Sequence, residues 1–315
     1  MADDLPRSPI TNCRDNPKTC ERLELEETVI NGGLLSHAGG LTACFSYYDR
    51  TDTGMLMYYA WKGNGSLGDL PERQLDPATS YTGILTSADG EAWHGPISRI
   101  DGGFPNWAPS ALADGRLLMP GNAGVAWTDD PAGMDGWQRS TLPRIDPGET
   151  DDPEGFIVAC RNRGDSHNHC ESSAFQTDDG VIHRLMRTGQ GWLSVSESRD
   201  RGETWSEPVP TDYTDVSSKH IFGRLPDGRF YGLSSPQPSS PRTPLVLAVS
   251  EDGVRFDRHW VVGDAPNQLA RLPGMHKYGR YGYPHLCLAD DQVCIIYSMA
   301  KEDILFVRFP LANLS

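Results

Sequence analysis

A short pattern that recurs along this chain limits the folds it can form. The clearest copy is SRDRGETW, from Ser198 to Trp205, which follows an alternating run typical of a strand. Asp and Ser side chains can accept hydrogen bonds from the backbone N–H groups of a turn, Gly permits a positive φ, and an aromatic ring can fill the space between sheets. We therefore expect Asp200 and Trp205 to be structural. Related copies are ILTSADGEAW (84–93), LAVSEDGVRF (247–256) and the more divergent VAWTDDPAGMDGW (125–137).

A second repeat, a hairpin with a tight turn, lies upstream of each copy of the first. Asp-Gly between alternating apolar residues is a strong hairpin signal. Because the hairpins recur about every 50 to 75 residues, they leave no room for long helices and predict an all-β chain. The hairpins are GGLLSHAGGLTACFSY (32–47), APSALADGRLLMPGN (108–122), SSAFQTDDGVIHRLMR (172–187), IFGRLPDGRFYGLSS (221–235) and PHLCLADDQVCIIYS (284–298).

Repeated four-stranded antiparallel units predict a single β-propeller domain over residues 1–315, with blades around a central axis. A two-sheet sandwich with accidental internal similarity is the alternative. Six blades remain open if 48–83 or 140–168 contains a divergent one, although we interpret 145–168 as an insertion loop. We expect five blades, at about 28–103, 104–145, 169–212, 217–262 and 280–312.

The ends of the sequence suggest how the ring closes. The last unit, DILFVRFPL (303–311), is followed by no turn motif. The run RLELEETVI (22–30) alternates as a strand does and could supply the missing outer strand of the last blade. We therefore expect this N-terminal strand to close the ring.

Composition excludes several partners. The net charge of −15 argues against nucleic acid or an anionic membrane surface, since both require a cationic footprint. No apolar run is long enough to span a bilayer, and MADDLPRSPI lacks the apolar core of a secretion signal, so a cytoplasmic location is expected unless a leader precedes this sequence. Seven cysteines without a CxxC pair fit reduced thiols. Oligomeric state is not indicated.

The pattern from Ser198 to Trp205 resembles the Asp box, or BNR repeat, of the sialidase superfamily of propellers. With the divergent copies and the hairpins, the resemblance extends over nearly the whole chain. It implies the fold more than the reaction, because Asp boxes lie at the blade periphery, away from the active site.

Ligands of propellers bind over the axis, where the innermost strands begin. Counting back eight or nine residues from each hairpin turn reaches equivalent axial positions. An inner strand should be apolar and small, yet this ring is polar and titratable, which marks a candidate site. The positions are Asn31, Asn106 or Trp107, Glu171, Lys219 or His220, and Tyr283.

Further candidates lie next to this ring. His169 shares a strand face with Glu171, and Arg187 lies on the return strand of the same hairpin, within plausible reach of Glu171. Asn122 is the equivalent of Arg187 in an earlier hairpin. Each has a structural alternative: Arg187 as an ordinary ion-pair partner, the histidines as satisfied polar groups, and the tyrosines as packing aromatics. Also included are Arg242, at the start of a later strand, and Tyr281 and His285, which flank Tyr283.

A metal site is a weaker hypothesis. His167 and His169 form a candidate pair with Glu171, but no third ligand stands at a matching spacing. We therefore expect no metal and no other cofactor.

The sialidase resemblance assigns roles to some of these residues. ESSAFQTDDGVIHRLMR, from Glu171 to Arg187, looks like the family's Glu followed by an Arg that binds the substrate carboxylate. YPHLCLADDQVCIIY, from Tyr283, is similar to the strand that opens with the Tyr nucleophile, and Arg242 matches another carboxylate-binding Arg more weakly. The chain departs from the family at Asn31, where sialidases have Arg-Ile-Pro, and it has no clear acid/base Asp, although Asp49 and Asp52 lie in a plausible loop.

Three functions follow, of which hydrolysis is the leading one. A sialidase-like glycoside hydrolase would release a terminal acidic sugar, with Tyr283 as nucleophile, Glu171 as its base and Arg187 with Arg242 as carboxylate clamp. A lyase acting on uronate-containing glycans would use Arg187 with Asn106 or Asn122 to neutralise the carboxylate, His169 or His220 as base and Tyr283 as acid. A non-catalytic glycan-binding propeller is the third. In each case the partner is an oligo- or polysaccharide.

Overall fold

The computed structural model describes residues 27–49, 80–101, 107–121, 124–142, 170–188, 190–216, 218–238, 241–264 and 281–314. The expected insertion loop at 145–168, and most of the segment 48–83 in which a sixth blade was considered, lie outside these ranges. Within the described ranges, no helix is both long and apolar enough to pass through a bilayer.

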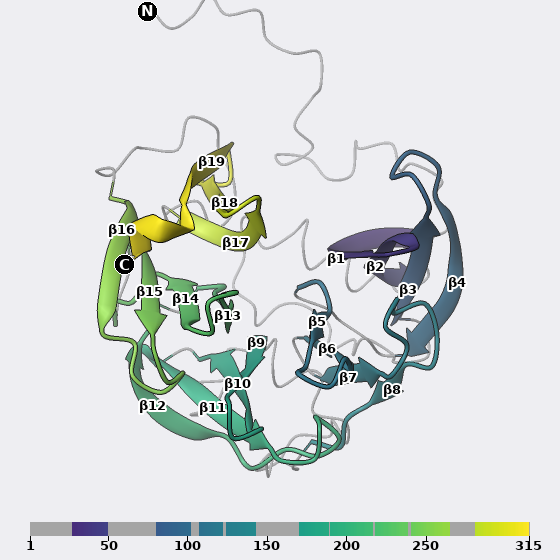
Figure 1. Cartoon of the computed structure of the whole chain (residues 1–315), viewed down its shortest axis with the longest axis horizontal. Coiled ribbons are helices and arrows are strands. Elements are labelled where there is room, and N and C mark those ends of the chain that lie inside the picture. Colours follow the sequence, from purple (N-terminus) through teal and green to yellow (C-terminus); the bar gives the residue numbers. More distant parts are fainter. Residues whose placement is uncertain are drawn as a thin grey trace, which may run out of the picture.

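The described residues form five antiparallel sheets arranged around a common axis (Figure 1), which confirms the five-bladed all-β propeller. Strands pair in sequence order within each sheet. In the first sheet they are β1 (Glu27–His37), β2 (Gly40–Asp49), β3 (Ser80–Ser87) and β4 (His94–Asp101). In the second they are β5 (Ser110–Ala111), β6 (Leu117–Pro120), β7 (Val125–Thr128) and β8 (Gln138–Arg139).

The remaining three sheets repeat this arrangement. The third contains β9 (Cys170–Gln176), β10 (Ile182–Arg187), β11 (Trp192–Ser198) and β12 (Val209–Thr214). The fourth contains β13 (Ile221–Arg224), β14 (Phe230–Ser234), β15 (Leu245–Ser250) and β16 (Arg258–Gly263). The fifth contains β17 (Tyr281–Ala289), β18 (Gln292–Met299) and β19 (Asp303–Pro310), followed by a 3-10 turn at Leu311–Leu314.

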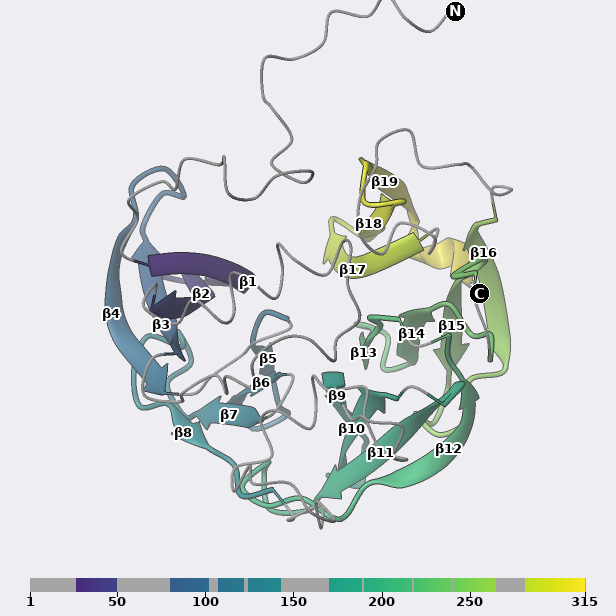
Figure 2. The ribbon, with the colours of Figure 1, turned by 180° about the vertical axis from the view of Figure 1, so that it is seen from behind.

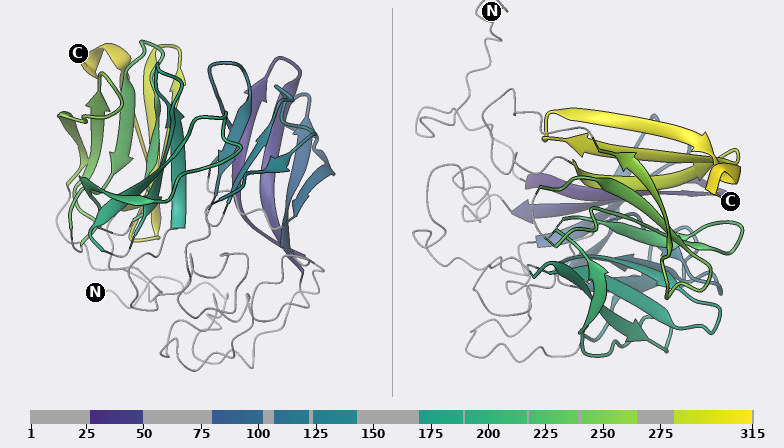
Figure 3. Two further views of the ribbon diagram at one scale, coloured as in Figure 1. Left: turned by 90° about the horizontal axis from the view of Figure 1, so that it is seen from below. Right: turned by 90° about the vertical axis from the view of Figure 1, so that its left-hand side faces the viewer.

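The inner strands β1, β5, β9, β13 and β17 lie nearest the axis in both face views (Figure 2). Side views show the strands running along the axis rather than across it (Figure 3). An inner strand therefore begins at one end of the propeller and finishes at the other, and residues at equivalent register positions gather at the same end.

The expected closure by an N-terminal strand is not shown. Residues 27–30 of the run RLELEETVI belong to β1 and pair with β2, as in Val29 opposite Tyr47. Residues 27–30 continue directly into the rest of this inner strand, so their backbone groups are used in the first blade. The fifth sheet has three described strands, with β19 at its edge, and residues 22–26 lie outside the described ranges.

The core lies between the blades. Strands β7, β14 and β15 are buried at every position, because each face of a blade packs on a neighbouring blade or on the next layer of side chains. Leu247, Val249 and Ile295 are completely inaccessible and belong to the largest apolar cluster, which joins the fourth and fifth blades.

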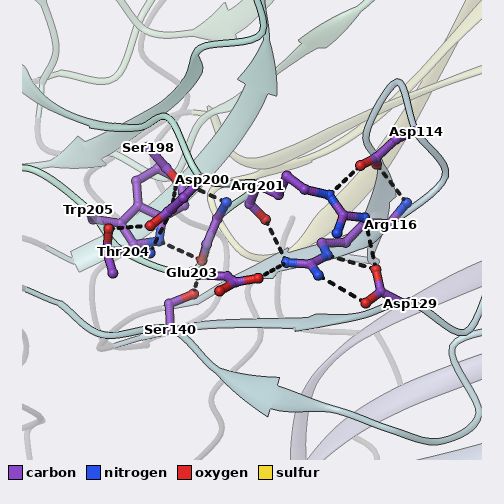
Figure 4. Close-up of polar contacts among 11 residues, drawn as sticks. Asp114, Arg116, Asp129, Ser140, Ser198, Asp200, Arg201, Glu203, Thr204 and Trp205 are labelled. Carbon is purple, nitrogen blue, oxygen red and sulfur yellow. Dashed lines mark hydrogen bonds and ion pairs between the residues drawn. The ribbon is translucent and has the colours of Figure 1, made fainter.

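The SRDRGETW turn has the structural role predicted for it (Figure 4). Asp200 accepts hydrogen bonds from the Thr204 N–H (2.9 Å) and the Ser198 hydroxyl (2.8 Å). Gly202 has a φ of 85° and donates its N–H to Ser198 Oγ. Trp205 is 7% exposed and belongs to an apolar cluster with Leu118 of the second blade. The Asp box thus closes its own turn and fills the junction between two blades.

The related copies form the same kind of turn. Asp89 accepts hydrogen bonds from the N–H groups of Glu91 and Ala92, and Asp252 accepts them from the N–H groups of Val254 and Arg255. In the divergent copy the turn is longer, and Asp130 accepts hydrogen bonds from the N–H groups of Met134 and Asp135. The repeat inferred from sequence is therefore present in four blades.

An ionic cluster around the buried Arg116 joins the second blade to the third, and the sequence did not indicate it. Arg116, which is 3% exposed, donates to both carboxylate oxygens of Asp129 (2.8 and 2.9 Å) and to Glu203 of the Asp box (2.9 Å). Its guanidinium carbon lies 3.7 Å from the centre of the Trp127 ring. Arg201 bonds to Asp129 and to the turn residue Asp114 (Figure 4).

Candidate active site

Three inner strands contain a bulge in their first half, at the residue that counting from the hairpin turns selected. Pairing shifts at Asn31 in β1, at Glu171 in β9 and at Tyr283 in β17. Glu171 and Tyr283 also have positive φ values, 43° and 54°. A bulge leaves one residue outside the ladder and redirects its side chain, and residues other than glycine at positive φ are concentrated at functional sites. The backbone thus presents Glu171 and Tyr283 at the same end of the axis.

Glu171 and Arg187 form the ion pair that their shared hairpin predicted. Arg187 Nη1 donates a hydrogen bond to Glu171 Oε2. Both side chains are largely buried: 25% of the Arg187 side chain and 16% of the Glu171 side chain are exposed. Burial alone would raise the pKa of Glu171, but Arg187, Lys219 and Arg242 lower it below its usual range. Glu171 is therefore a carboxylate at neutral pH.

Arg242, which precedes β15, completes a pair of guanidinium groups at this end of the axis. Its Nη1 lies close to Gly282: a Cβ added to this glycine would be 3.8 Å from that nitrogen. Burial lowers the Arg242 pKa, and the charge of Arg187 lowers it further, while Glu171 and Tyr283 act in the opposite direction. Two neighbouring cations that repel each other form a site suited to an anionic ligand.

Tyr283 is accessible to a ligand, with 44% of its surface exposed. Burial of part of the side chain and the charge of Glu171 raise the pKa of its phenol. Arg242 and Arg187 lower this pKa, but by less. The phenol is therefore protonated at neutral pH and lies beside a carboxylate that can accept its proton.

Lys219, Trp107 and His285 form a second cluster beside Tyr283. Lys219 Nζ lies 4.1 Å from the centre of the Trp107 ring and 5.7 Å from that of Tyr283. His285 stacks on Trp107, with ring centres 5.5 Å apart. Lys219 is 9% exposed, and burial lowers its pKa to about 8, against a smaller opposing effect of Glu171.

Asp215 is a site residue that the sequence analysis missed. It follows β12, is completely buried, and accepts hydrogen bonds from the Ser218 N–H (3.0 Å) and hydroxyl (3.2 Å). Burial raises its pKa to about 6, although Ser218, Arg187 and Arg242 act to lower it. Because Asp215 lies in a loop between blades, counting along hairpins could not locate it.

Two predicted residues lie behind the site in this structure. His220 is completely buried, and its Nε2 is 3.3 Å from the Leu185 carbonyl oxygen. Burial lowers its pKa to about 4, so the ring is neutral at pH 7. Tyr281 is 3% exposed and packs edge-on against Tyr297, as the alternative of a packing aromatic predicted.

Several sequence candidates are not described. Asn106, Asn122, His167, His169 and Asp52 lie outside the described ranges, and only the backbone of Asn31 is described. Their roles stay predictions. Among the described side chains there is no group of three His, Cys, Asp or Glu residues that could hold a metal ion.

An apolar cavity of about 360 Å³ runs along the axis next to the polar cluster. Inner-strand residues such as Ala111, Ala174 and Leu286 line it, and Trp107 and His285 form part of its wall. The cavity wall is made mainly of small and apolar side chains, with Gln176 and Arg224 among its polar members.

Comparison with known proteins supports this description of the fold. A BNR repeat-like domain model matches residues 36–295. The NanB sialidase of Streptococcus pneumoniae, as its K499G mutant, superimposes with a TM-score of 0.58 and 14% identity over 96% of this chain and 59% of the other. No curated protein sequence matches the chain significantly.

Two further structures have the same fold. The leech intramolecular trans-sialidase, complexed with 2,7-anhydro-Neu5Ac, gives a TM-score of 0.57 and 16% identity over 91% of this chain and 57% of the other. The Trypanosoma rangeli sialidase in complex with sialic acid gives a TM-score of 0.53 and 12% identity over 91% of this chain and 45% of the other. The chain thus spans about half to three-fifths of the length of these proteins. Since the domain model covers most of the sequence, the chain belongs to the family of BNR repeat-like domains.

Proposed function

We propose that this protein is a glycoside hydrolase that releases a terminal acidic sugar, a uronate or a sialate-like acid, from an oligo- or polysaccharide. One observation carries the proposal: the Glu171–Arg187 ion pair lies beside Arg242 and an accessible Tyr283 at one end of the propeller axis. This set combines an anion clamp, a base and a nucleophile. The sialidases of the same fold, one of them in complex with sialic acid, support the class of substrate.

The charges favour an acidic substrate. Arg187, Arg242 and Lys219 lie together within a chain whose net charge is −15. Guanidinium groups bind carboxylates with charge-assisted hydrogen bonds, which are about twice as strong as neutral ones. The arginine pair would hold the sugar carboxylate and orient the anomeric carbon towards the phenol of Tyr283.

The reaction would proceed in two displacements. Glu171 accepts the phenol proton while the Tyr283 oxygen bonds to the anomeric carbon and the glycosidic bond breaks, and the leaving oxygen takes a proton from a general acid. Water then attacks the anomeric carbon and gives its proton to the deprotonated general acid, while the bond to Tyr283 breaks and the phenol regains the proton from Glu171. The general acid is expected to be a His or an Asp, and no described residue is assigned to that role.

The raised pKa of Tyr283 favours lyase chemistry as the second candidate, because a protonated phenol is a suitable general acid at neutral pH. Arg187 would neutralise a uronate carboxylate and Tyr283 would protonate the leaving oxygen. His169 would take the C5 proton, since His220 is buried against the third blade. A non-catalytic glycan-binding role is the remaining alternative.

One assay distinguishes these functions. The protein is incubated with uronate- and sialate-terminated oligosaccharides while ultraviolet absorbance and new reducing ends are measured together. New reducing sugar without absorbance supports hydrolysis, and absorbance from an unsaturated uronate supports the lyase. Binding of an acidic oligosaccharide with neither product would contradict both enzymatic proposals and support the non-catalytic role.

A further inference from the structure

The axial cavity has a buried end near Tyr283 and an exposed end near the hairpin turns. The inner strands run along the axis (Figure 3), so their first residues and their turns lie at opposite ends of the cavity. At the first end, Trp107 is 8% exposed and stacks on His285. Towards the turns, Ala111 and Ala113 line the cavity and are exposed. The cavity is therefore entered from the turns, and the stacked rings separate it from the Tyr283 site.

Two ring nitrogens at the buried end have no hydrogen-bond partner among the residues that the structure describes. They are Trp107 Nε1 and His285 Nδ1, and both atoms are buried. A buried indole N–H usually has a partner, because an unpaired donor away from water is costly. Burial and the charge of Lys219 lower the pKa of His285, so its ring is neutral at pH 7 and one ring nitrogen can accept a hydrogen bond. The buried end thus offers one donor and one acceptor to a ligand in the cavity.

The rest of the wall favours a neutral, apolar ligand. Arg224 is ion-paired with Asp178, and the Gln176 side-chain oxygen accepts the Ala113 N–H (2.9 Å), so these polar groups already have partners. Phe175 contributes an aromatic ring to the wall. A volume of about 360 Å³ lies within the range of small-molecule sites, which are mostly apolar with a few polar groups that fix orientation.

We propose that the cavity binds a small neutral aromatic alcohol or phenol. Its ring lies between the inner strands, and its hydroxyl accepts a hydrogen bond from Trp107 Nε1 and donates one to His285 Nδ1, in the tautomer that has its hydrogen on Nε2. A hydroxyl suits this position because it is both a donor and an acceptor. The inference goes beyond the proposed function, since the ligand enters from the opposite end of the axis and carries no acidic sugar.

The test uses two probes of nearly the same shape. Binding of 2-naphthol and of 2-methylnaphthalene, in which a methyl group replaces the hydroxyl, is measured by equilibrium dialysis against the full chain at pH 7. We expect 2-naphthol to bind about tenfold more tightly, because its hydroxyl pairs with the two buried nitrogens. Trp107→Phe and His285→Phe each keep an aromatic ring but lose one of these nitrogens. Each should reduce the preference to about threefold or less.

A third variant tests whether the probes occupy this cavity. Ala111→Leu places a larger side chain in the wall and should weaken binding of both probes by about tenfold or more. The matched controls are Trp93→Phe and Ala92→Leu, at exposed positions outside the cavity wall, and they should leave both affinities unchanged. Melting temperatures establish that each variant is folded.

The outcomes are independent of the proposed function, because neither probe contains a sugar acid. Failure of both probes to bind the wild type, or equal affinity for the two, overturns the inference. An unchanged preference in the Phe variants, or unchanged affinities in Ala111→Leu, also overturns it, because the probes then bind elsewhere. Absence of any reaction with acidic glycosides would overturn the proposed hydrolase and leave this inference standing.

Discussion

At the scale of single residues, the site depends on side chains held in backbone conformations that are costly by themselves. Glu171 and Tyr283 each have a positive φ, which for such residues costs on the order of 1 to 3 kcal/mol. The bulges at the start of β9 and β17 hold them in this conformation and direct them towards the arginine pair. The surrounding sheets therefore support a local arrangement that the residues would not adopt alone.

Replacement of Arg187 by Ala should remove most of the activity on acidic sugars. Loss of its charge-assisted bonds to a carboxylate, and of its bond to Glu171, should lower kcat/KM by about 100-fold or more. Steady-state kinetics test this, with Arg199→Ala, an exposed arginine of the same blade, as the control. Retained activity in Arg187→Ala would rule out the acidic-sugar mechanism.

Tyr283→Phe and Glu171→Gln together separate the two reaction classes. Tyr283→Phe should lower kcat by about 100-fold or more in either class while acidic sugars still bind, since a reacting group is lost. Glu171→Gln should have a comparable effect in the hydrolase, where Glu171 is the base. In the lyase, Glu171 only orients Arg187, so a loss below about tenfold would argue for elimination.

At the scale of elements, the Asp-box turns and the cluster around Arg116 connect one blade to the next. Trp205 from the third blade packs near Leu118 of the second, and Glu203 of the same turn bonds to Arg116. The box therefore stabilises a junction between blades as well as its own turn. It lies away from the axial residues, which is why the most recognisable sequence motif does not report the chemistry.

Arg116→Met should destabilise the junction between the second and third blades. Arg116 is almost completely buried, but Asp129 and Glu203 are about half exposed, so the remaining carboxylates can be solvated and the loss should be about 2 kcal/mol. Denaturant unfolding measures this, with Arg255→Met, an exposed ion-paired arginine, as the control. Equal stability of the two variants would show that the cluster contributes little.

At the scale of the whole molecule, the site reduces stability. Burial gives Lys219 a folded pKa of about 8, below its usual value of 10.5, so its contribution to stability is present above pH 10.5 and is lost as pH falls through 8. Asp215 has a pKa raised to about 6 from 3.8, so its contribution is present below pH 3.8 and is lost as pH rises through 6. At neutral pH both groups therefore oppose folding, and the interblade core must offset them.

Lys219→Met should consequently make the protein more stable. We expect a gain of about 1 to 2 kcal/mol at pH 7, where the buried ammonium is charged, and a smaller gain at pH 10. Chemical denaturation at the two pH values provides the comparison. A loss of stability at pH 7 would instead mean that the interaction of Lys219 with Glu171 outweighs the cost of burial.

The sequence alone determined the repeat, the five blades and the level at which Glu171, Lys219 and Tyr283 gather, because turn chemistry and strand alternation are local and their register is preserved along each hairpin. The pairing of residues 27–30 within the first blade, the burial of His220 and the presence of Asp215 depended on the tertiary structure. Each follows from contacts between segments far apart in the chain: β1 with β2, His220 with β10, and a loop between blades with two arginines. Such contacts depend on how the blades pack together, which the periodicity of single strands does not predict.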